Sequence, residues 1–337
     1  MDVADPGLPA AEPPGYGPKV AFLSALPGME RVIETHMAHV FLFADRVLKL
    51  KKPVALGMLD HRTLAARHRA CAAELRLNRE LAGDGVYRGL LPLVVVAGRM
   101  GVGGPGRVVD WLVHMRRLPA DRMLDRLVTE RRPVERSLLS VLTRDLAAFY
   151  RRSRRAGEGR HLARLRQEAE VNAGHLAAMA VHVPQVAVAG LAAVCAHRIR
   201  AHKHEIALRE RQGLIVEGHG DLRPEHVCLI ARPVVFDRVE FLRDIRLADP
   251  FDEVGHLALE CALLGAPDLG GPLLSGLEAA GLAAPSAGLL STYRLVRCLS
   301  RARLSLDHLH DEGRSDTGRW IAKASAYLAE AARLASA

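Results

Sequence analysis

Aromatic side chains are scarce in this chain of 337 residues, because phenylalanine, tyrosine and tryptophan together make up only 4%. The hydrophobic core must therefore be built mainly from leucine, valine and alanine. The scarcity also argues against a nucleic-acid-binding module, which needs aromatic platforms for the bases. The five cysteines are scattered and never form a C-x-x-C pair. Disulfides and a zinc site are both unexpected, which fits a protein of the reducing cytoplasm.

Long hydrophobic runs are also missing. The most apolar long stretch, residues 176–196, is dominated by alanine and interrupted by His182, Pro184 and Gln185, so we do not expect it to span a membrane. Residues 1–18 are rich in proline, glycine and alanine and lack the basic-then-apolar pattern of a secretory signal. We expect them to form a disordered leader.

The overall composition is that of a soluble globular protein, with 49% hydrophobic and 25% charged residues. The length allows one large or two ordinary domains with a sizeable core. The net charge of +9 suits an anionic ligand such as a nucleotide, but also nucleic acid or a membrane surface. Much of the excess is arginine in helical stretches such as 151–155, for which a solvated helix face is the simpler interpretation.

The most informative segment covers residues 217–241 and reads EGHGDLRPEHVCLIARPVVFDRVEF. Two apolar runs, 227–230 and 234–236, are separated by Ala-Arg-Pro, which predicts a tight β-hairpin. Asp221 precedes the hairpin and Asp237 follows it, so the hairpin can bring the two carboxylates close together. Nearby carboxylates repel unless a cation lies beside them. The segment therefore predicts a magnesium–phosphate site in which one carboxylate binds metal and the other accepts a hydroxyl proton.

The same segment resembles the catalytic and metal loops of aminoglycoside phosphotransferase-like kinases, which are distant relatives of protein kinases. The resemblance rests on HGDL at 219–222, on His226 and on FD at 236–237, and ADPFD at 248–252 looks like the family's following acidic motif. More closely, the chain resembles the kinase-like half of bacterial bifunctional proteins in which this domain is often fused to a P-loop ATPase. No G-x-x-x-x-G-K-[ST] motif occurs, so we expect the kinase-like part alone, with a P-loop ATPase as a possible partner.

The resemblance implies a role for each residue of this segment. Asp221 would be the catalytic base, and His219 would hold its loop through a backbone contact. Asp237 would be the principal magnesium ligand. His226 stands where the family usually has asparagine, the second metal ligand, although magnesium prefers oxygen donors. Three outcomes stay open: a single magnesium ion, a site that accepts manganese, or nucleotide binding without efficient turnover.

The N-terminal third has the strand and helix order of a kinase-like small lobe. Residues 20–29 predict a short helix, and 32–34, 39–43 and 46–50 predict three strands. The turn at 35–38 contains no glycine, unlike the phosphate-covering turn of protein kinases.

Lys49 and Lys51 lie two residues apart and therefore share one strand face. The resemblance favours Lys49 as the residue that reaches the nucleotide phosphates, with Lys51 as the runner-up. A helix predicted over 63–81 carries Glu74, which matches the family position that pairs with the strand lysine. Two solvent-facing lysines and a solvated glutamate are the alternative interpretation.

Residues 101–106 match G-x-G-x-x-G by letter, but the segment contains a proline and precedes a strand rather than a helix. We therefore interpret it as the flexible tip between strands at 90–97 and 108–115, and residues 116–119 as the hinge between lobes. From residue 121 the pattern turns helical. Helices are expected at 137–150, 158–183, 187–210, 250–264, 270–280, 287–310 and 317–335.

Asp249 and Asp252 are expected to steady the catalytic loop by accepting hydrogen bonds. Asp249 is also expected to cap a helix whose first residue is Pro250.

The expected fold is therefore α+β and two-lobed, protein-kinase-like, with a small antiparallel-sheet N-lobe over 19–113 and a larger, mostly helical C-lobe over 114–337. The expected function is ATP-dependent transfer of the γ-phosphate to a hydroxyl of a small molecule. ATP and Mg²⁺, or Mn²⁺, are the expected cofactors, and neither nucleic acid nor a membrane is an expected partner. A nucleotide-binding regulator or pseudokinase with little turnover is the alternative function.

Overall fold

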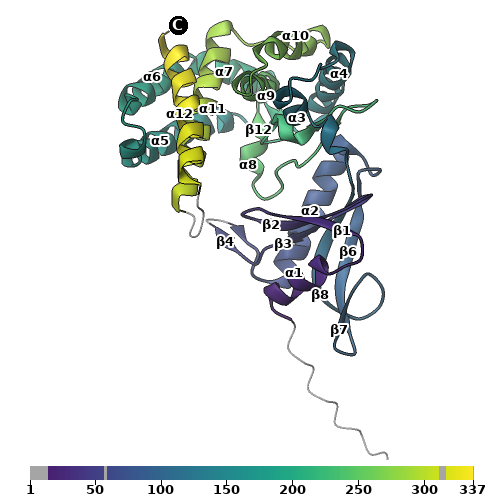
Figure 1. Ribbon diagram of the computed structural model, residues 1–337. Helices are drawn as coiled ribbons and strands as arrows, with labels where there is room; N and C mark the ends of the chain where they lie inside the picture. The colour runs from purple at the N-terminus through teal and green to yellow at the C-terminus, as the bar shows by residue number, and fades with distance from the viewer. Residues whose placement is uncertain (1–13, 57–58, 311–315, 337) are drawn as a thin grey trace, which may run out of the picture. The chain divides into compact units, whose positions relative to one another are not determined.

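The computed structural model describes residues 14–56, 59–310 and 316–336 (Figure 1). The chain divides into two compact units, 1–119 and 120–337. The first unit is built around an antiparallel sheet, and the second is mostly helical (Figure 1). The expected α+β organisation, with a small sheet unit before a larger helical one, is therefore confirmed.

The sheet of the first unit has six strands in the order β1-β2-β3-β8-β6-β7, and every neighbouring pair is antiparallel. Its strands are β1 (Met29–Glu34), β2 (Ala38–Phe43), β3 (Arg46–Lys51), β6 (Tyr87–Val96), β7 (Arg99–Val102) and β8 (Arg107–Arg116). Two short strands, β4 (Ala55–Leu56) and β5 (Leu59–Asp60), form a separate hairpin. Leu48 and Leu50 of β3 are buried in a hydrophobic cluster, against which residues of α1 (Tyr16–Ser24) pack. Because side chains alternate along a strand, the lysines at 49 and 51 point to the opposite face.

Helix α2 (Leu64–Ala82) packs against β6 and β8 (Figure 1). The Thr63 side chain caps it by accepting a hydrogen bond from the Ala66 amide at 3.1 Å. Cys71, Glu74 and Leu77 are among the residues that the helix buries. The helix expected over 63–81 is therefore found with nearly the expected limits.

Four expectations for the first unit need correction. The first helix begins at Tyr16 rather than at residue 20, so the end of the expected leader is helical, while residues 1–13 lie outside the described residues. The glycine-rich segment 101–106 is not a simple hairpin tip, because 101–102 belong to β7 and only 103–106 connect it to β8. The expected lobe boundary at 113/114 would cut β8, which continues to residue 116, and the units separate at 119/120 instead.

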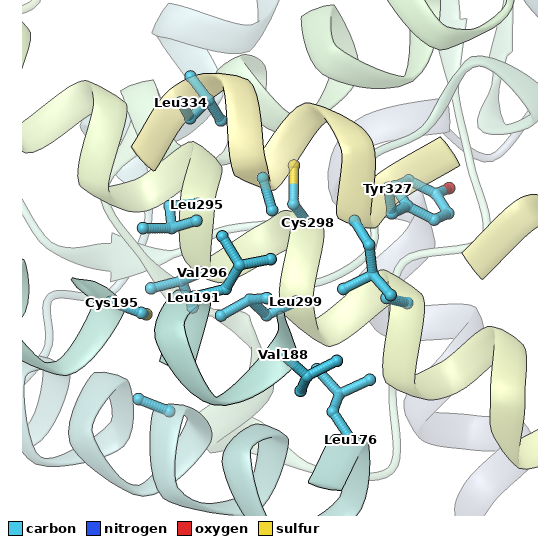
Figure 2. Close-up of a cluster of buried hydrophobic side chains, with 14 of the residues drawn as sticks. Leu176, Val188, Leu191, Cys195, Leu295, Val296, Cys298, Leu299, Tyr327 and Leu334 are labelled. Carbon is cyan, nitrogen blue, oxygen red and sulfur yellow. The ribbon is translucent and has the colours of Figure 1, made fainter. Parts of the chain in front are cut away.

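The second unit is made of helices and two small two-stranded sheets. Its helices are α3 (Leu124–Thr129), α4 (Arg136–Arg152), α5 (Arg160–Ala178), α6 (Val188–Ala201), α7 (Lys203–Arg211), α8 (Arg243–Arg246), α9 (Pro250–Leu263), α10 (Gly270–Ala279), α11 (Ala287–Asp307) and α12 (Thr317–Ser336). Their main core combines leucine, valine and alanine with Cys195, Cys298 and Tyr327, as Figure 2 shows. Aliphatic side chains therefore fill most of this core, in agreement with the low aromatic content.

The helix expected over 158–183 is shorter than expected, and the helix expected over 187–210 is divided in two. The first ends at Ala178, before a 3₁₀ turn, Ala180–His182. The second breaks at His202, which ends α6 and precedes α7. The His202 ring packs closely against α11, because a side chain added at Gly288 would come within 2.8 Å of it. Within the described part of the chain, no helix is long and apolar enough to cross a membrane.

Candidate active site

The loop that carries the expected base lies between two short strands. β9 (Val216–Glu217) precedes it and pairs with β12 (Leu247–Ala248), and β10 (Val227–Cys228) follows it. Gly220 has a φ of 92°, a backbone conformation that residues with a Cβ rarely adopt. A side chain at Gly218 would collide with the Glu253 carboxylate. Both glycines therefore have a steric reason to be glycine.

Glu253, in the first turn of α9, organises this loop. Its Oε2 accepts hydrogen bonds from the His219 amide at 2.8 Å and from the Tyr150 hydroxyl at 2.8 Å. Its Oε1 accepts a bond from the Gly220 amide at 2.7 Å. The carboxylate is buried, so these three donors replace the water that it gave up.

The expectation that Asp249 and Asp252 steady the catalytic loop is wrong. Asp249 caps α9 as expected, by accepting from the Phe251 amide at 2.9 Å, and it pairs with Arg209. Asp252 is held by Arg297 in a bidentate pair with two 2.9 Å bonds. The loop contact belongs to the next residue along the helix, Glu253.

The buried ring of His219 hydrogen-bonds to two backbone groups. Its Nε2 lies 2.8 Å from the carbonyl oxygen of Phe236, and its Nδ1 accepts from the Asp221 amide at 3.3 Å. These partners require the neutral ring with its proton on Nε2. Burial, assisted by the neighbouring His226, lowers the pKa of His219 to about 4. The side chain ties the loop to the strand that leads into Asp237.

Asp221 lies at the end of this loop, between two arginines. Its Oδ2 is 3.0 Å from both Nε and Nη2 of Arg223, and its Oδ1 is 3.9 Å from Nη1 of Arg301. Burial alone would raise the pKa of Asp221, but Arg223, His226 and Arg301 outweigh burial and hold this pKa well below its usual value. The carboxylate is therefore ionised, and its side chain is partly exposed.

His226 and Asp237 are held together by the expected hairpin. β10 pairs with β11 (Val234–Val235), and the Phe236 amide donates to the His226 carbonyl oxygen at 3.1 Å. The His226 Nδ1 donates to the Asp221 carbonyl oxygen at 2.8 Å, since a carbonyl can only accept. The other ring nitrogen, Nε2, lies 3.7 Å from Oδ2 of Asp237. Asp237 itself has a φ of 62°, an uncommon conformation for a residue other than glycine.

The donor set of this pair suits a divalent ion only in part. The Asp237 carboxylate is an oxygen donor of the kind that Mg²⁺ prefers, and the His226 nitrogen is a better ligand for transition metals such as Mn²⁺. Among the residues that the structure describes, no group of three or more His, Cys, Asp or Glu side chains could hold a metal ion. An ion here would need further ligands, such as phosphate oxygens.

The first unit brings its three expected site residues together. Glu74 of α2 is fully buried, with Oε2 at 2.6 Å from the Lys51 Nζ and Oε1 at 2.9 Å from the Lys49 Nζ. The side chain of Lys51 is 1% exposed and that of Lys49 is 14% exposed, so Lys49 offers the more accessible ammonium group. The solvent-facing interpretation of the two lysines is therefore wrong, whereas a contact with phosphate stays a prediction.

Sequence reasoning missed three residues of the site. Arg223 follows HGDL directly, and Glu253 follows ADPFD directly, so both could have been found by extending the two motifs by one residue. Arg301 lies 80 positions after Asp221 in a helix rich in arginine, and no sequence signal distinguishes it from its neighbours.

No family model matches the chain. Uncharacterized proteins of Mycobacterium bovis and Mycobacterium tuberculosis are 32% identical to it over 289 residues, which are 81% of this chain and 54% of each relative. The chain thus spans about half the length of the curated relatives that it matches.

Solved structures of small-molecule kinases are similar in fold. A choline/ethanolamine kinase family protein from Mesorhizobium loti gives a TM-score of 0.54 at 16% identity, covering 95% of each chain. A choline kinase from Streptococcus pneumoniae gives 0.51 at 13% identity, covering 94% of this chain and 100% of that one. The GDP complex of an aminoglycoside 2'-phosphotransferase gives 0.50 at 14% identity, covering 94% and 97%. At these identities the likeness shows the fold.

Proposed function

We propose that this chain is an ATP-dependent phosphotransferase with a small-molecule hydroxyl as acceptor. The proposal starts from the two-lobed, protein-kinase-like fold that the chain shares with choline/ethanolamine kinases and aminoglycoside phosphotransferases. The observation that carries the proposal is the arrangement around one hairpin. Asp221 has an ionised carboxylate, and its backbone carbonyl accepts a hydrogen bond from His226, which lies 3.7 Å from Asp237, the second donor suited to a divalent ion. A phosphoryl transfer needs both parts: a group that positions the attacking hydroxyl and a cation that neutralises the phosphates.

Asp221 acts on the attacking hydroxyl. As the hydroxyl oxygen bonds to the γ-phosphorus and the bond to the departing ADP breaks, the hydroxyl proton passes to the Asp221 carboxylate. Arg223 and Arg301 keep this carboxylate ionised, so it is a weak base whose main contribution is to orient the nucleophile. Glu253 and His219 act on Asp221 through the loop backbone and are positioning residues.

Asp237 and His226 would hold a divalent ion, and the ion would supply positive charge that neutralises the phosphates. The imidazole favours a site that also accepts Mn²⁺, because nitrogen is a better donor to transition metals than to Mg²⁺.

Lys49 binds the nucleotide phosphates, and the Glu74 carboxylate fixes the direction of its side chain. Lys51 is the second choice for this role, because its ammonium group is buried against the same carboxylate.

A nucleotide-binding regulator with little turnover is the second candidate function. It is favoured by two departures from the kinase pattern, the histidine at 226 and the turn at 35–38 that contains no glycine. The greater length of the mycobacterial relatives also leaves room for a P-loop ATPase partner.

We also propose a cytoplasmic site of action without a membrane or nucleic-acid partner.

Isothermal titration calorimetry of ATP tests the proposal, with Mg²⁺ or Mn²⁺ and then with chelator, on the wild type and on Asp237→Asn. We expect micromolar binding that depends on metal in the wild type and loses this dependence in the variant. Release of ADP in the presence of hydroxyl compounds then separates the two functions, because a regulator binds nucleotide without turnover. The absence of binding in all conditions would refute both candidates.

A further inference from the structure

Positive charge surrounds Asp221 on the side of α11 and α12. Arg301 of α11 lies 3.9 Å from Asp221 Oδ1, and its guanidinium lies over the ring of Tyr327 in α12, 5.9 Å from the centroid. One turn before Tyr327 in α12 stands Lys323, whose ammonium group lies 6.0 Å from the ring centroid of Trp320. Asp221, Arg301 and Lys323 all belong to the second unit, so this arrangement is internal to one compact body.

The two carboxylates of this region, those of Glu260 and Glu225, already have hydrogen-bond or ion-pair partners. Glu260 accepts from the Tyr327 hydroxyl at 2.6 Å and lies 3.2 Å from the His256 ring and 3.4 Å from Arg301 Nε. Glu225 pairs with Arg223. Neither carboxylate is therefore left to bind a cationic substrate without breaking existing contacts.

One cation of this region, Lys323, is in contrast unmatched among the described residues. Lys323 makes no hydrogen bond and no ion pair within the described ranges 14–56, 59–310 and 316–336. Arg301 differs from Lys323, because it pairs with Glu260 and Asp221, although its buried Nε makes no hydrogen bond within the part of the chain that the structure describes. Burial, and then the nearby Arg301, lower the pKa of Lys323, against the opposing effect of Glu260. A positive group that is half buried and repelled by another is stabilised when an anion arrives.

We propose that the acceptor is an anion: a small hydroxyl compound with a phosphate or carboxylate group that Lys323 and Arg301 bind while its hydroxyl lies against Asp221. This inference rests on the proposed function, and it deepens it by naming the charge of the substrate. Choline and the aminoglycosides are cations, and a cation at this place would meet Lys323, for which no carboxylate partner is found among the described residues.

Labelling of Lys323 tests the anion site without any turnover. Pyridoxal 5'-phosphate, an anionic aldehyde, condenses with a lysine amine with loss of water, and borohydride reduces the C=N bond to a stable amine that peptide mass spectrometry locates. Pyridoxal, which lacks the phosphate, is the matched probe. Exposed Lys203 of α7 is the internal reference and corrects for the different reactivity of the two aldehydes.

We expect the ratio of Lys323 to Lys203 labelling to be about tenfold higher with pyridoxal 5'-phosphate than with pyridoxal, because the phosphate gains charge-assisted bonds to arginine. Arg301→Gln should remove most of this preference, and Arg301→Lys should keep part of it. Unchanged Lys203 labelling and an unchanged circular dichroism spectrum would show that both variants fold. An equal ratio for the two probes would overturn the anion site and leave Lys323 as a lysine that packs on Trp320.

A set of acceptors with the same carbon skeleton tests the substrate itself. D-glucose, D-glucosamine, D-gluconate and D-glucose 6-phosphate differ in charge, and choline and kanamycin are added as cations. Stimulation of ADP release by gluconate or by glucose 6-phosphate supports the inference and distinguishes carboxylate from phosphate. Preference for glucosamine, choline or kanamycin would overturn it while supporting phosphotransfer. If nucleotide does not bind at all, the proposed function fails, and the labelling ratio still decides whether the anion site exists.

Discussion

Glu253→Gln should loosen the loop that carries Asp221 without changing the size of the side chain. The carboxylate accepts from two backbone amides and one hydroxyl, all within 2.8 Å. Glutamine keeps one acceptor oxygen but presents an NH₂ group to the other backbone amide, so one bond to a buried charge is lost. Such a bond contributes about 1.5–3 kcal/mol, which corresponds to roughly 10- to 150-fold faster amide exchange if the loop opens locally.

Hydrogen exchange followed by mass spectrometry on a peptide that covers 216–223 measures this directly. Tyr150→Phe is the matched control, because it removes the hydroxyl bond to Oε2 and leaves both backbone bonds in place. We expect fast exchange of the His219 and Gly220 amides in Glu253→Gln and nearly wild-type exchange in the control. If the two variants exchange alike, Glu253 does not hold the loop, and the reasoning is wrong.

Three further predictions concern the second unit. Asp221→Asn should leave ATP affinity nearly intact and reduce turnover by about 10²–10⁴-fold, measured as ADP release; an unchanged rate would remove this residue from the role of base. His226→Asn should preserve or raise Mg²⁺-supported activity and weaken Mn²⁺ binding in electron paramagnetic resonance titrations, whereas loss of all activity would point to another role for the imidazole. Burial, with help from Arg164, lowers the pKa of His161 to about 3, so below pH 6.5 the unfolded chain binds the proton that the folded chain refuses. The free energy of unfolding should therefore fall by roughly 1 kcal/mol per pH unit as the pH is lowered from 6.5 to 3. Urea titrations at several pH values should show a weaker dependence of this free energy on pH in His161→Phe than in the wild type.

The order of elements could be predicted from the sequence because local patterns determine it. Alternation placed Lys49 and Lys51 on one strand face, and the Ala-Arg-Pro break placed the hairpin between Asp221 and Asp237. The cap at Thr63 likewise fixed the start of α2. Each of these signals lies within a few residues of the element that it determines.

The partners of the catalytic loop could not be predicted in the same way. Glu253 contacts residues 33 and 34 positions earlier, and three acidic residues in the segment 249–253 offered equal candidates. Only the direction in which each side chain leaves α9 decides that Asp252 meets Arg297 while Glu253 meets the loop. His202, at the break between α6 and α7, likewise packs against a distant residue, Gly288, 86 positions later.

In the hairpin between His226 and Asp237, the distance between these two side chains does not depend on the number of residues at the tip. The bond from the Phe236 amide to the His226 carbonyl closes the base of the hairpin, whereas Arg232 at the tip is 83% exposed. Residues added between Ala231 and Arg232 would lengthen only the exposed end. The tip is therefore a position at which a short peptide tag or a fluorescent label can be inserted while His226 and Asp237 keep their spacing.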